Sequence, residues 1–273
     1  MSAIEIWKQR VVAHHAQSDQ ARAALEIAET DVWEPFSPFF KADPHRTDDP
    51  EVDRLAREVN PSTTLLDVGG GAGRFALPLA LRCHHVTVVE PSSVMGESLR
   101  HLAAEAGIEN VTLVAKRWEE AEVEPADIAL SAHVVYMIAD IRPFVLKLVE
   151  HARKKVCMPT YMRPPMSRFA PFWRWVHGED KQEVPGAAEF MHVLWEMDIY
   201  PHLEMFEAIP FRAFKTWQQA LETLRQRLFV MPDTEKDARL QQAMHELLME
   251  MPAGYVIKGT QPGRLALISW QPA

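Results

Sequence analysis

The chain has 273 residues, of which 47% are hydrophobic and 25% charged, an ordinary globular composition that can bury a large core. Its formal net charge is −9, and basic residues form only a loose scatter between 153 and 174, which argues against a nucleic-acid substrate. No apolar run approaches the roughly 20 residues that a membrane-spanning helix needs, so no membrane partner is expected.

The N-terminus and the cysteines indicate where the protein works. Glu5, Lys8 and Arg10 place charges where a signal peptide would begin, so we do not expect one. Cys83 and Cys157 are too few for a disulfide scaffold, which favours a reduced, cytoplasmic protein. The C-x-x-C and H-E-x-x-H spacings are absent, so no metal site is predicted.

The predicted elements begin with a helix over residues 4–28, whose apolar positions recur at helical spacing. A loop rich in aromatic residues and proline follows at 33–44. We therefore predict that residues 1–45 form an N-terminal helical and aromatic cap. A short helix is predicted over 50–59, ended by the Asn-Pro pair that follows it.

From residue 65 onward, short apolar segments alternate with helical ones. The predicted strands cover 65–68, 86–89, 111–115, 126–131 and 156–161. The predicted helices between them cover 74–83, 93–106 and 140–152. Apolar strands separated by helices indicate a parallel sheet with helices on both faces.

The C-terminal part departs from this alternation. Residues 162–186 show no clear period but are rich in proline, phenylalanine and tryptophan. The remaining predicted elements are a helix at 187–197, a strand-like segment at 203–214, two amphipathic helices within 215–251 and a last strand at 265–270. The second of the two helices is predicted to begin at a cap, Thr234. We predict one domain, 1–273, with its core at 50–161 and cap insertions at 162–186 and 215–251.

The most informative motif is LLDVGGGAG at residues 65–73, where an apolar strand ends in an acid and then in glycines. Alternate glycines let a ligand lie against bare backbone at the start of the next helix. A P-loop is excluded because no Gly-Lys-Ser/Thr follows. The strict dinucleotide fingerprint G-x-G-x-x-G also fails, because its third glycine position is Arg74 when counted from Gly69 and Ala76 when counted from Gly71.

The pattern that does fit, Asp-x-Gly-x-Gly-x-Gly, resembles the donor-binding loop of class I S-adenosylmethionine-dependent methyltransferases. The resemblance implies a Rossmann-like, seven-stranded, mostly parallel α/β sheet with an antiparallel last strand, a helical cap and S-adenosyl-L-methionine as cofactor. It also implies that Asp67 helps to hold the methionyl ammonium of the donor. Gly69, Gly71 and Gly73 would let the donor's tail and ribose approach the backbone.

Glu90 is the second expected contact with the donor. It ends the second strand, where an acid can accept two hydrogen bonds from the vicinal hydroxyls of a ribose. Pro91 and Met95 follow it and are candidate apolar partners for one face of the adenine, although Met95 is equally suited to the helix core.

The adenine edge is where the chain departs from the family pattern. After the third strand the family usually places an acid followed by a small residue, whereas this chain has Arg117 and Trp118. A side-chain contact from Arg117 to the adenine amino group is therefore in question. The ring of Trp118 could instead flank the adenine, and its backbone amide could reach the base edge.

The segment after the fourth strand, Ser131-Ala132-His133-Val134-Val135-Tyr136, would lie beside the methyl group in this fold. It is not the Asn/Asp-Pro-Pro-Tyr/Phe pattern of methyltransferases that act on adenine or glutamine amino groups. His133 is the best candidate for a catalytic group, because a histidine near the acceptor suits the activation of a hydroxyl or a thiol. The alternative is a hydrogen-bonded structural histidine.

The acceptor is less constrained by the sequence. The aromatic segments 33–40 and 162–186 and the helical pair are expected to form walls over the C-terminal edge of the sheet. The candidate pocket residues are Tyr136, Tyr161, Arg163 and Trp173. The alternative is that these aromatic side chains are only the core of the cap.

We therefore predict an enzyme that transfers a methyl group from S-adenosylmethionine to a small molecule. Three alternatives remain: a nucleic-acid or protein methyltransferase, a related transfer such as that of an aminopropyl group, and a non-catalytic donor-binding subunit. The sequence leaves the oligomeric state open, a homodimer included.

Overall fold

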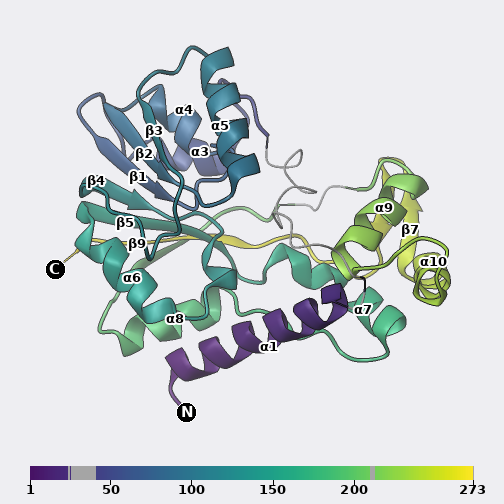
Figure 1. The fold of residues 1–273 in the computed structure, drawn as a ribbon. Helices are drawn as coiled ribbons and strands as arrows, with labels where there is room; N and C mark the ends of the chain where they lie inside the picture. The colour runs from purple at the N-terminus through teal and green to yellow at the C-terminus, as the bar shows by residue number, and fades with distance from the viewer. Residues whose placement is uncertain (24, 26–40, 210–212, 273) are drawn as a thin grey trace.

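The computed structural model describes residues 1–23, 25, 41–209 and 213–272. Its centre is a seven-stranded sheet in the order β3-β2-β1-β4-β5-β9-β6 (Figure 1). The strands are β1 (Thr64–Val68), β2 (His85–Val89), β3 (Val111–Val114), β4 (Ala126–Leu130), β5 (Ala152–Tyr161), β6 (His202–Met205) and β9 (Leu265–Trp270). The last strand, β9, runs antiparallel to both of its neighbours, and β1 to β5 pair in parallel. The predicted fold class is confirmed.

Helices cover both faces of this sheet. One face carries α3 (Pro50–Leu55), α4 (Ala76–Ala80) and α5 (Ser93–Glu105), and the other carries α1 (Ala3–Ala23), α6 (Ile141–Glu150) and α8 (Ala187–Glu196). The alternation of side chains along β1 explains the two cores, since Leu65 packs with the first set and Leu66 and Val68 with the second.

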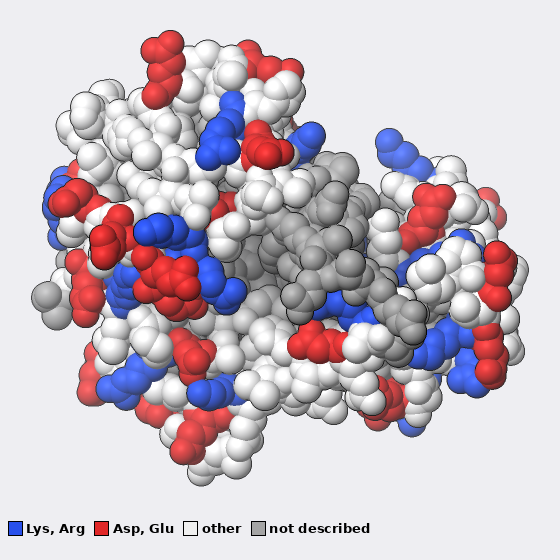
Figure 2. Space-filling view, viewed as in Figure 1, with Lys and Arg blue, Asp and Glu red and all other residues white. Residues whose placement is uncertain are grey.

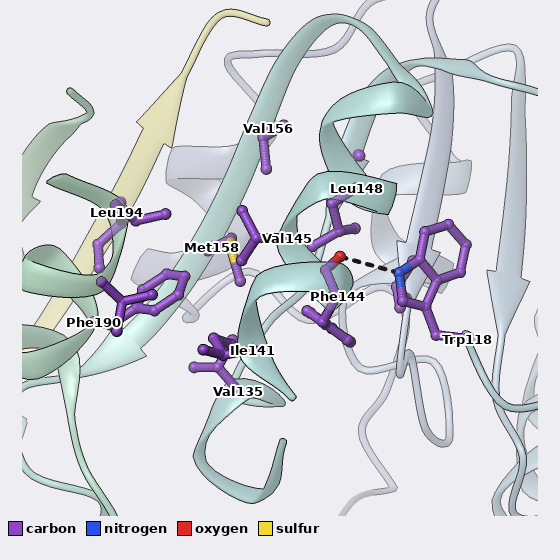
Figure 3. Packing of buried hydrophobic residues seen from close by; sticks show 14 of the residues in the cluster. Trp118, Val135, Ile141, Phe144, Val145, Leu148, Val156, Met158, Phe190 and Leu194 are labelled. Atoms are coloured by element: carbon purple, nitrogen blue, oxygen red, sulfur yellow. Dashed lines mark hydrogen bonds between the residues drawn. The ribbon is translucent and has the colours of Figure 1, made fainter. Parts of the chain in front are cut away.

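Figure 3 shows the second of these cores from close by. Phe144 and Leu148 of α6 and Phe190 of α8 point toward the middle of the sheet, where Met158 of β5 lies. Trp118 closes one side of the cluster and donates its indole N–H to the carbonyl of Phe144 at 3.3 Å.

A third cluster of buried side chains lies beside the sheet, at the right of Figure 1. Its elements are η3 (Pro165–Phe169), α7 (Ala170–His177), α9 (Trp217–Leu228), α10 (Glu235–Leu247), β7 (Leu248–Met251) and β8 (Gly254–Ile257). Phe172 and Trp173 of α7 pack there with Leu224 of α9 and Met244 of α10. This is the region that the sequence assigns to the cap.

Two features of the cap differ from the sequence expectation. The helix α7 lies within 162–186, where no period was found, because it has only eight residues and so repeats its apolar spacing barely twice. Pro171 in its first turn and Gly178 after its end, at φ +76°, are the signals that mark its limits. The strand β7 of the β7–β8 hairpin occupies the end of 215–251, a segment that we predicted as helical.

The structure also gives more exact limits for two of the predicted elements. Thr234 caps α10 as predicted, accepting the N–H of Asp237 with its hydroxyl at 3.2 Å. The predicted strand at 203–214 is regular only over β6, and isolated bridges join Ile209 to Gly263 and Phe214 to Tyr255 farther on. The aromatic segment 33–40 lies outside the described residues.

Candidate functional site

The glycine loop after β1 has the left-handed backbone that its sequence suggested. Gly69, Gly71 and Gly73 have φ values of +75°, +56° and +86°. A Cβ atom at Gly69 would lie 2.5 Å from the side chain of Val134, so the loop packs directly against the segment after β4. A Cβ at Gly71 would meet nothing within 4 Å, so the loop is open at its middle glycine.

Asp67, the acid of the motif, lies beneath this loop. A Cβ at Gly70 would be 2.8 Å from its Oδ2 atom, so a bare backbone is required there as well. Asp67 is 1% exposed, and its Oδ2 has no hydrogen-bond partner in the described part of the chain. Burial, and secondarily the charge of Glu90, raise the pKa of the Asp67 carboxyl to about 7. A cationic or hydrogen-bonding group beside this carboxyl would offset the cost of burying it.

Glu90 follows β2 and is held in place by backbone groups. Its Oε2 accepts the N–H of Gly71 at 2.9 Å, and its Oε1 accepts the N–H of Ser92 at 2.8 Å. The carboxylate therefore joins the glycine loop to the start of α5, and both lie at the carboxyl edge of the parallel strands. Beyond it, Pro91 is exposed, whereas Met95 is buried in α5.

The two residues that depart from the family pattern occupy different environments. Arg117 is exposed on the surface and faces Glu119 at 3.9 Å. Trp118 is buried, and its ring lies under the ammonium of Lys147 at 4.6 Å and edge-on to His151. The indole is thus a core residue of the α6 side, and a donor contact by either residue stays a prediction.

The segment after β4 contacts the same edge of the sheet. Ser131 is buried and donates its hydroxyl to the carbonyl of Val68 at 3.1 Å, so it ties β4 to the end of β1. His133 has a φ of +61°, a conformation that non-glycine residues rarely adopt, and its N–H bonds to the carbonyl of Pro159 at 2.9 Å. Strained backbone of this kind concentrates at functional sites.

A buried carboxylate fixes the imidazole of His133. Glu51, in the first turn of α3, lies 2.7 Å from Nε2 of His133 through one oxygen and 2.7 Å from the guanidinium of Arg74 through the other. Burial raises the pKa of Glu51, but its bonds to His133 and Arg74 outweigh that effect and lower the pKa overall. Glu51 is therefore an ionised acceptor.

The network extends to a second carboxylate. Asp49, which caps α3, accepts from the guanidinium of Arg46 at 2.9 Å and from Arg74 at 3.2 Å. Sequence reasoning missed this cluster, since an acid after a proline at a helix start is explained by the helix dipole alone. Arg74 offered one signal, because it stands where a dinucleotide site would need glycine.

The predicted acceptor-side residues divide into two groups. Tyr136 in η2 (Val135–Met137) accepts the N–H of Tyr161 with its hydroxyl, and the ring of Tyr161 lies 5.1 Å from that of His133. Arg163 is exposed and paired with Glu183 at 2.7 Å. Trp173 is buried in the cap cluster, stacked on a histidine of its own helix. Tyr136 and Tyr161 thus lie with His133, whereas Trp173 belongs to the cap.

The described residues contain no group of three or more His, Cys, Asp and Glu side chains arranged to hold a metal ion. None of the described helices combines the length and the apolarity needed to cross a bilayer. On the face in Figure 2, acidic and basic side chains are interspersed over the described residues, and neither sign forms a continuous surface.

Comparisons with known proteins agree with this geometry. Residues 65–155 match the family model of the methyltransferase domain. An uncharacterised protein of Haemophilus influenzae is 29% identical over 103 residues, which span 37% of this chain and 38% of that protein.

Two solved structures share the fold. A putative methyltransferase from Bacillus halodurans superimposes with a TM-score of 0.57 at 16% identity, covering 81% of this chain and 97% of that one. Coclaurine N-methyltransferase bound to N-methylheliamine and S-adenosylhomocysteine superimposes with a TM-score of 0.52 at 13% identity, covering 97% of this chain and 88% of that one. The chain thus contains a segment that matches a methyltransferase domain, and its sheet shares the fold of these methyltransferases.

Proposed function

We propose that this protein is an enzyme that transfers a methyl group from S-adenosylmethionine to a small-molecule acceptor. The observation that carries the proposal is the buried Oδ2 of Asp67, which has no hydrogen-bond partner among the described residues and lies beneath a glycine loop that is open at Gly71. An ammonium group that reaches this carboxylate would remove the cost of burying it.

The donor's chemical groups fit the residues at the ends of β1 and β2. Asp67 would hold the methionyl ammonium, Gly69 to Gly73 would face the tail, and Glu90 would accept hydrogen bonds from the ribose hydroxyls. When bound, the sulfonium of the donor supplies an electrophilic methyl group.

The residues on the acceptor side would orient the nucleophile and exclude water. Ser131 and Val134 lie against the end of β1 and the glycine loop, so the segment that carries His133 borders the donor site. Methyl transfer is an in-line displacement that neutralises a cation, so alignment and a dry site account for much of its rate.

A small acceptor is favoured over a polymer. The net charge of −9 and the interspersed charges in Figure 2 are unlike the basic surface of a nucleic-acid enzyme. Coclaurine N-methyltransferase, which shares the fold, was crystallised with a small molecule. As further parts of the proposal, the chain forms one domain with a cap, and it works in the cytoplasm.

The rival functions make different predictions for donor binding. Aminopropyl transfer calls for further acids near the donor's tail, and the Ser-Ala-His segment after β4 supplies none. A non-catalytic subunit would bind the donor without turning it over.

Isothermal titration calorimetry with S-adenosylmethionine and with S-adenosylhomocysteine tests the proposal. We expect binding of at least roughly micromolar strength, about −8 kcal/mol, for both compounds. Failure of both to bind would refute the donor assignment.

A further inference from the structure

A cluster of charged side chains lies behind His133, and what we infer from it rests on the proposed function. Two carboxylates, Asp49 and Glu51, face two guanidinium groups, Arg46 and Arg74, at distances of 2.7–3.2 Å. The side chain of Glu51 is 2% exposed. Two negative and two positive charges balance, so the cluster is neutral without any charge on His133.

The same network determines which nitrogen of His133 carries the proton. Glu51 is ionised and can only accept, so the 2.7 Å contact requires Nε2 of His133 to donate. The neutral imidazole therefore has its proton on Nε2 and its lone pair on Nδ1.

The lone pair on Nδ1 has no partner in the described residues, and the atom is shielded from water. The ring lies near the rings of Phe75 and Tyr161, at centroid distances of 5.9 and 5.1 Å. Its backbone is fixed by the bond to Pro159. A preoriented, unsatisfied acceptor at the edge of the donor site is what a general base requires.

We propose that Glu51 is a positioning residue that presents Nδ1 of His133 as the base for an acceptor whose attacking atom carries a proton. As the lone pair of that atom, oxygen, sulfur or nitrogen, forms its bond to the methyl carbon, the carbon–sulfur bond of the donor breaks and its electrons remain on sulfur. The proton of the acceptor passes to Nδ1, and the imidazolium returns it to water after product release. Glu51 stabilises the imidazolium in between.

The tautomer of His133 can be measured without knowing the acceptor. Protein labelled with 15N-histidine, studied by two-bond 1H–15N correlation at neutral to mildly alkaline pH, reports which ring nitrogen carries the proton. A His133→Gln variant assigns the signal. We expect wild-type His133 to be protonated on Nε2 and unprotonated on Nδ1. Protonation on Nδ1 in the wild type would overturn the inference.

Glu51→Gln provides the sharper test. Arg74 would bind the amide oxygen of the new side chain, which turns the amide NH2 toward Nε2 of His133. We therefore expect the proton to move to Nδ1 in this variant. Asp53→Asn, an exposed change from acid to amide on the same helix, is the control and should leave the tautomer unchanged.

An unchanged tautomer in folded Glu51→Gln would also overturn the inference. If that variant fails to fold, the wild-type spectrum alone decides. Donor affinity separates the two proposals, because Glu51 lies outside the predicted donor contacts. Folded Glu51→Gln should bind S-adenosylhomocysteine within about twofold of wild type. If the wild-type protein does not bind the donor, the proposed function is refuted, whichever tautomer is found.

Discussion

The donor side and the His133 side of the site satisfy their buried charges in opposite ways. On the donor side, Asp67 is buried with one oxygen unpartnered in the described chain, and burial raises its pKa. On the other side, Glu51 is equally buried, yet both of its oxygens are bonded and its pKa is lowered. The pKa values of these two buried acids are thus shifted in opposite directions, which suits one to receive a cation and the other to orient a base.

The cap provides a third environment, in which aromatic side chains serve packing. Trp173 is 1% exposed and lies in the cap cluster, so Trp173→Ala should lower the free energy of unfolding by about 3–5 kcal/mol. Chemical denaturation measures this effect. Trp175→Ala on the same helix, where the side chain is 39% exposed, is the control and should change the value by no more than about 0.5 kcal/mol.

A Trp173→Ala protein that keeps its wild-type stability would contradict the core role. The predicted role of Trp173 in the acceptor pocket would then be the remaining explanation for this side chain. Donor affinity should be unchanged in the folded variant, since the cap cluster and the glycine loop are separate.

Glu90→Ala tests the donor side directly. Loss of a hydrogen-bonded carboxylate should weaken the binding of S-adenosylhomocysteine by about 1.5–3 kcal/mol, or roughly 10- to 150-fold. Calorimetry provides the measurement, and Glu97→Ala, an exposed acid on α5, is the control. An affinity equal to that of the control would remove Glu90 from the donor site.

The fold was largely predictable from the sequence, and the cap was less so. Strands β1 to β5 and β9 follow from apolar runs punctuated by glycine and proline, and β1, β4 and β9 are buried on both faces along almost their whole length. The short helix α7 and the hairpin of β7 and β8 have too few residues for a period to emerge. Their form depends on packing against α9 and α10 rather than on local pattern.

The site shows the same division. Asp67 and Glu90 could be predicted as donor contacts because backbone geometry confines acids at strand ends to one edge of the sheet, and their role stays a prediction. Glu51 was missed because its pairing with His133 joins residues 82 positions apart, and nothing local to α3 indicates it. The structure shows the ring of Trp118 packed against α6, and its predicted contact with the adenine stays a prediction.

Alanine at two glycines of the loop should separate packing from ligand contact. Both positions have positive φ, so each substitution costs about 1–2 kcal/mol of stability. Gly69→Ala should cost about 1–3 kcal/mol more, because its Cβ would be 2.5 Å from Val134, whereas Gly71→Ala meets open space. Equal melting behaviour of the two variants would contradict this packing.

We expect the opposite order for donor affinity: Gly71→Ala, the variant with the smaller loss of stability, should have the larger loss of affinity. The open space at Gly71 is where the proposal places the donor, so folded Gly71→Ala should lose affinity beyond any loss of stability. Calorimetry with S-adenosylhomocysteine on both variants provides the comparison, and an unimpaired Gly71→Ala would move the donor away from the loop.

The smallest effects that we expect are the dependence of folding stability and of donor binding on pH, and both come from Asp67. Its pKa is raised from 3.8 to about 7 in the folded protein, so the folded state retains a proton that the unfolded chain loses. Its contribution to stability is fully present below the unfolded pKa and is lost as the pH rises through the folded one. In the ligand-free protein, Asp67 should therefore favour folding less at pH 7 than at pH 4.

Binding of an ammonium should act in the opposite direction on the same group. The ammonium pairs only with the ionised carboxylate, so below about pH 7 donor binding must release the proton of Asp67, and affinity should fall by up to about tenfold per pH unit. Calorimetry in two buffers of different ionisation enthalpy counts that proton. Asp67→Asn should bind more weakly at neutral pH and lose most of this dependence. A wild-type affinity equal at about pH 6 and about pH 8 would mean that the ammonium does not reach Asp67, and the contrast with Glu51 would then be one of packing alone.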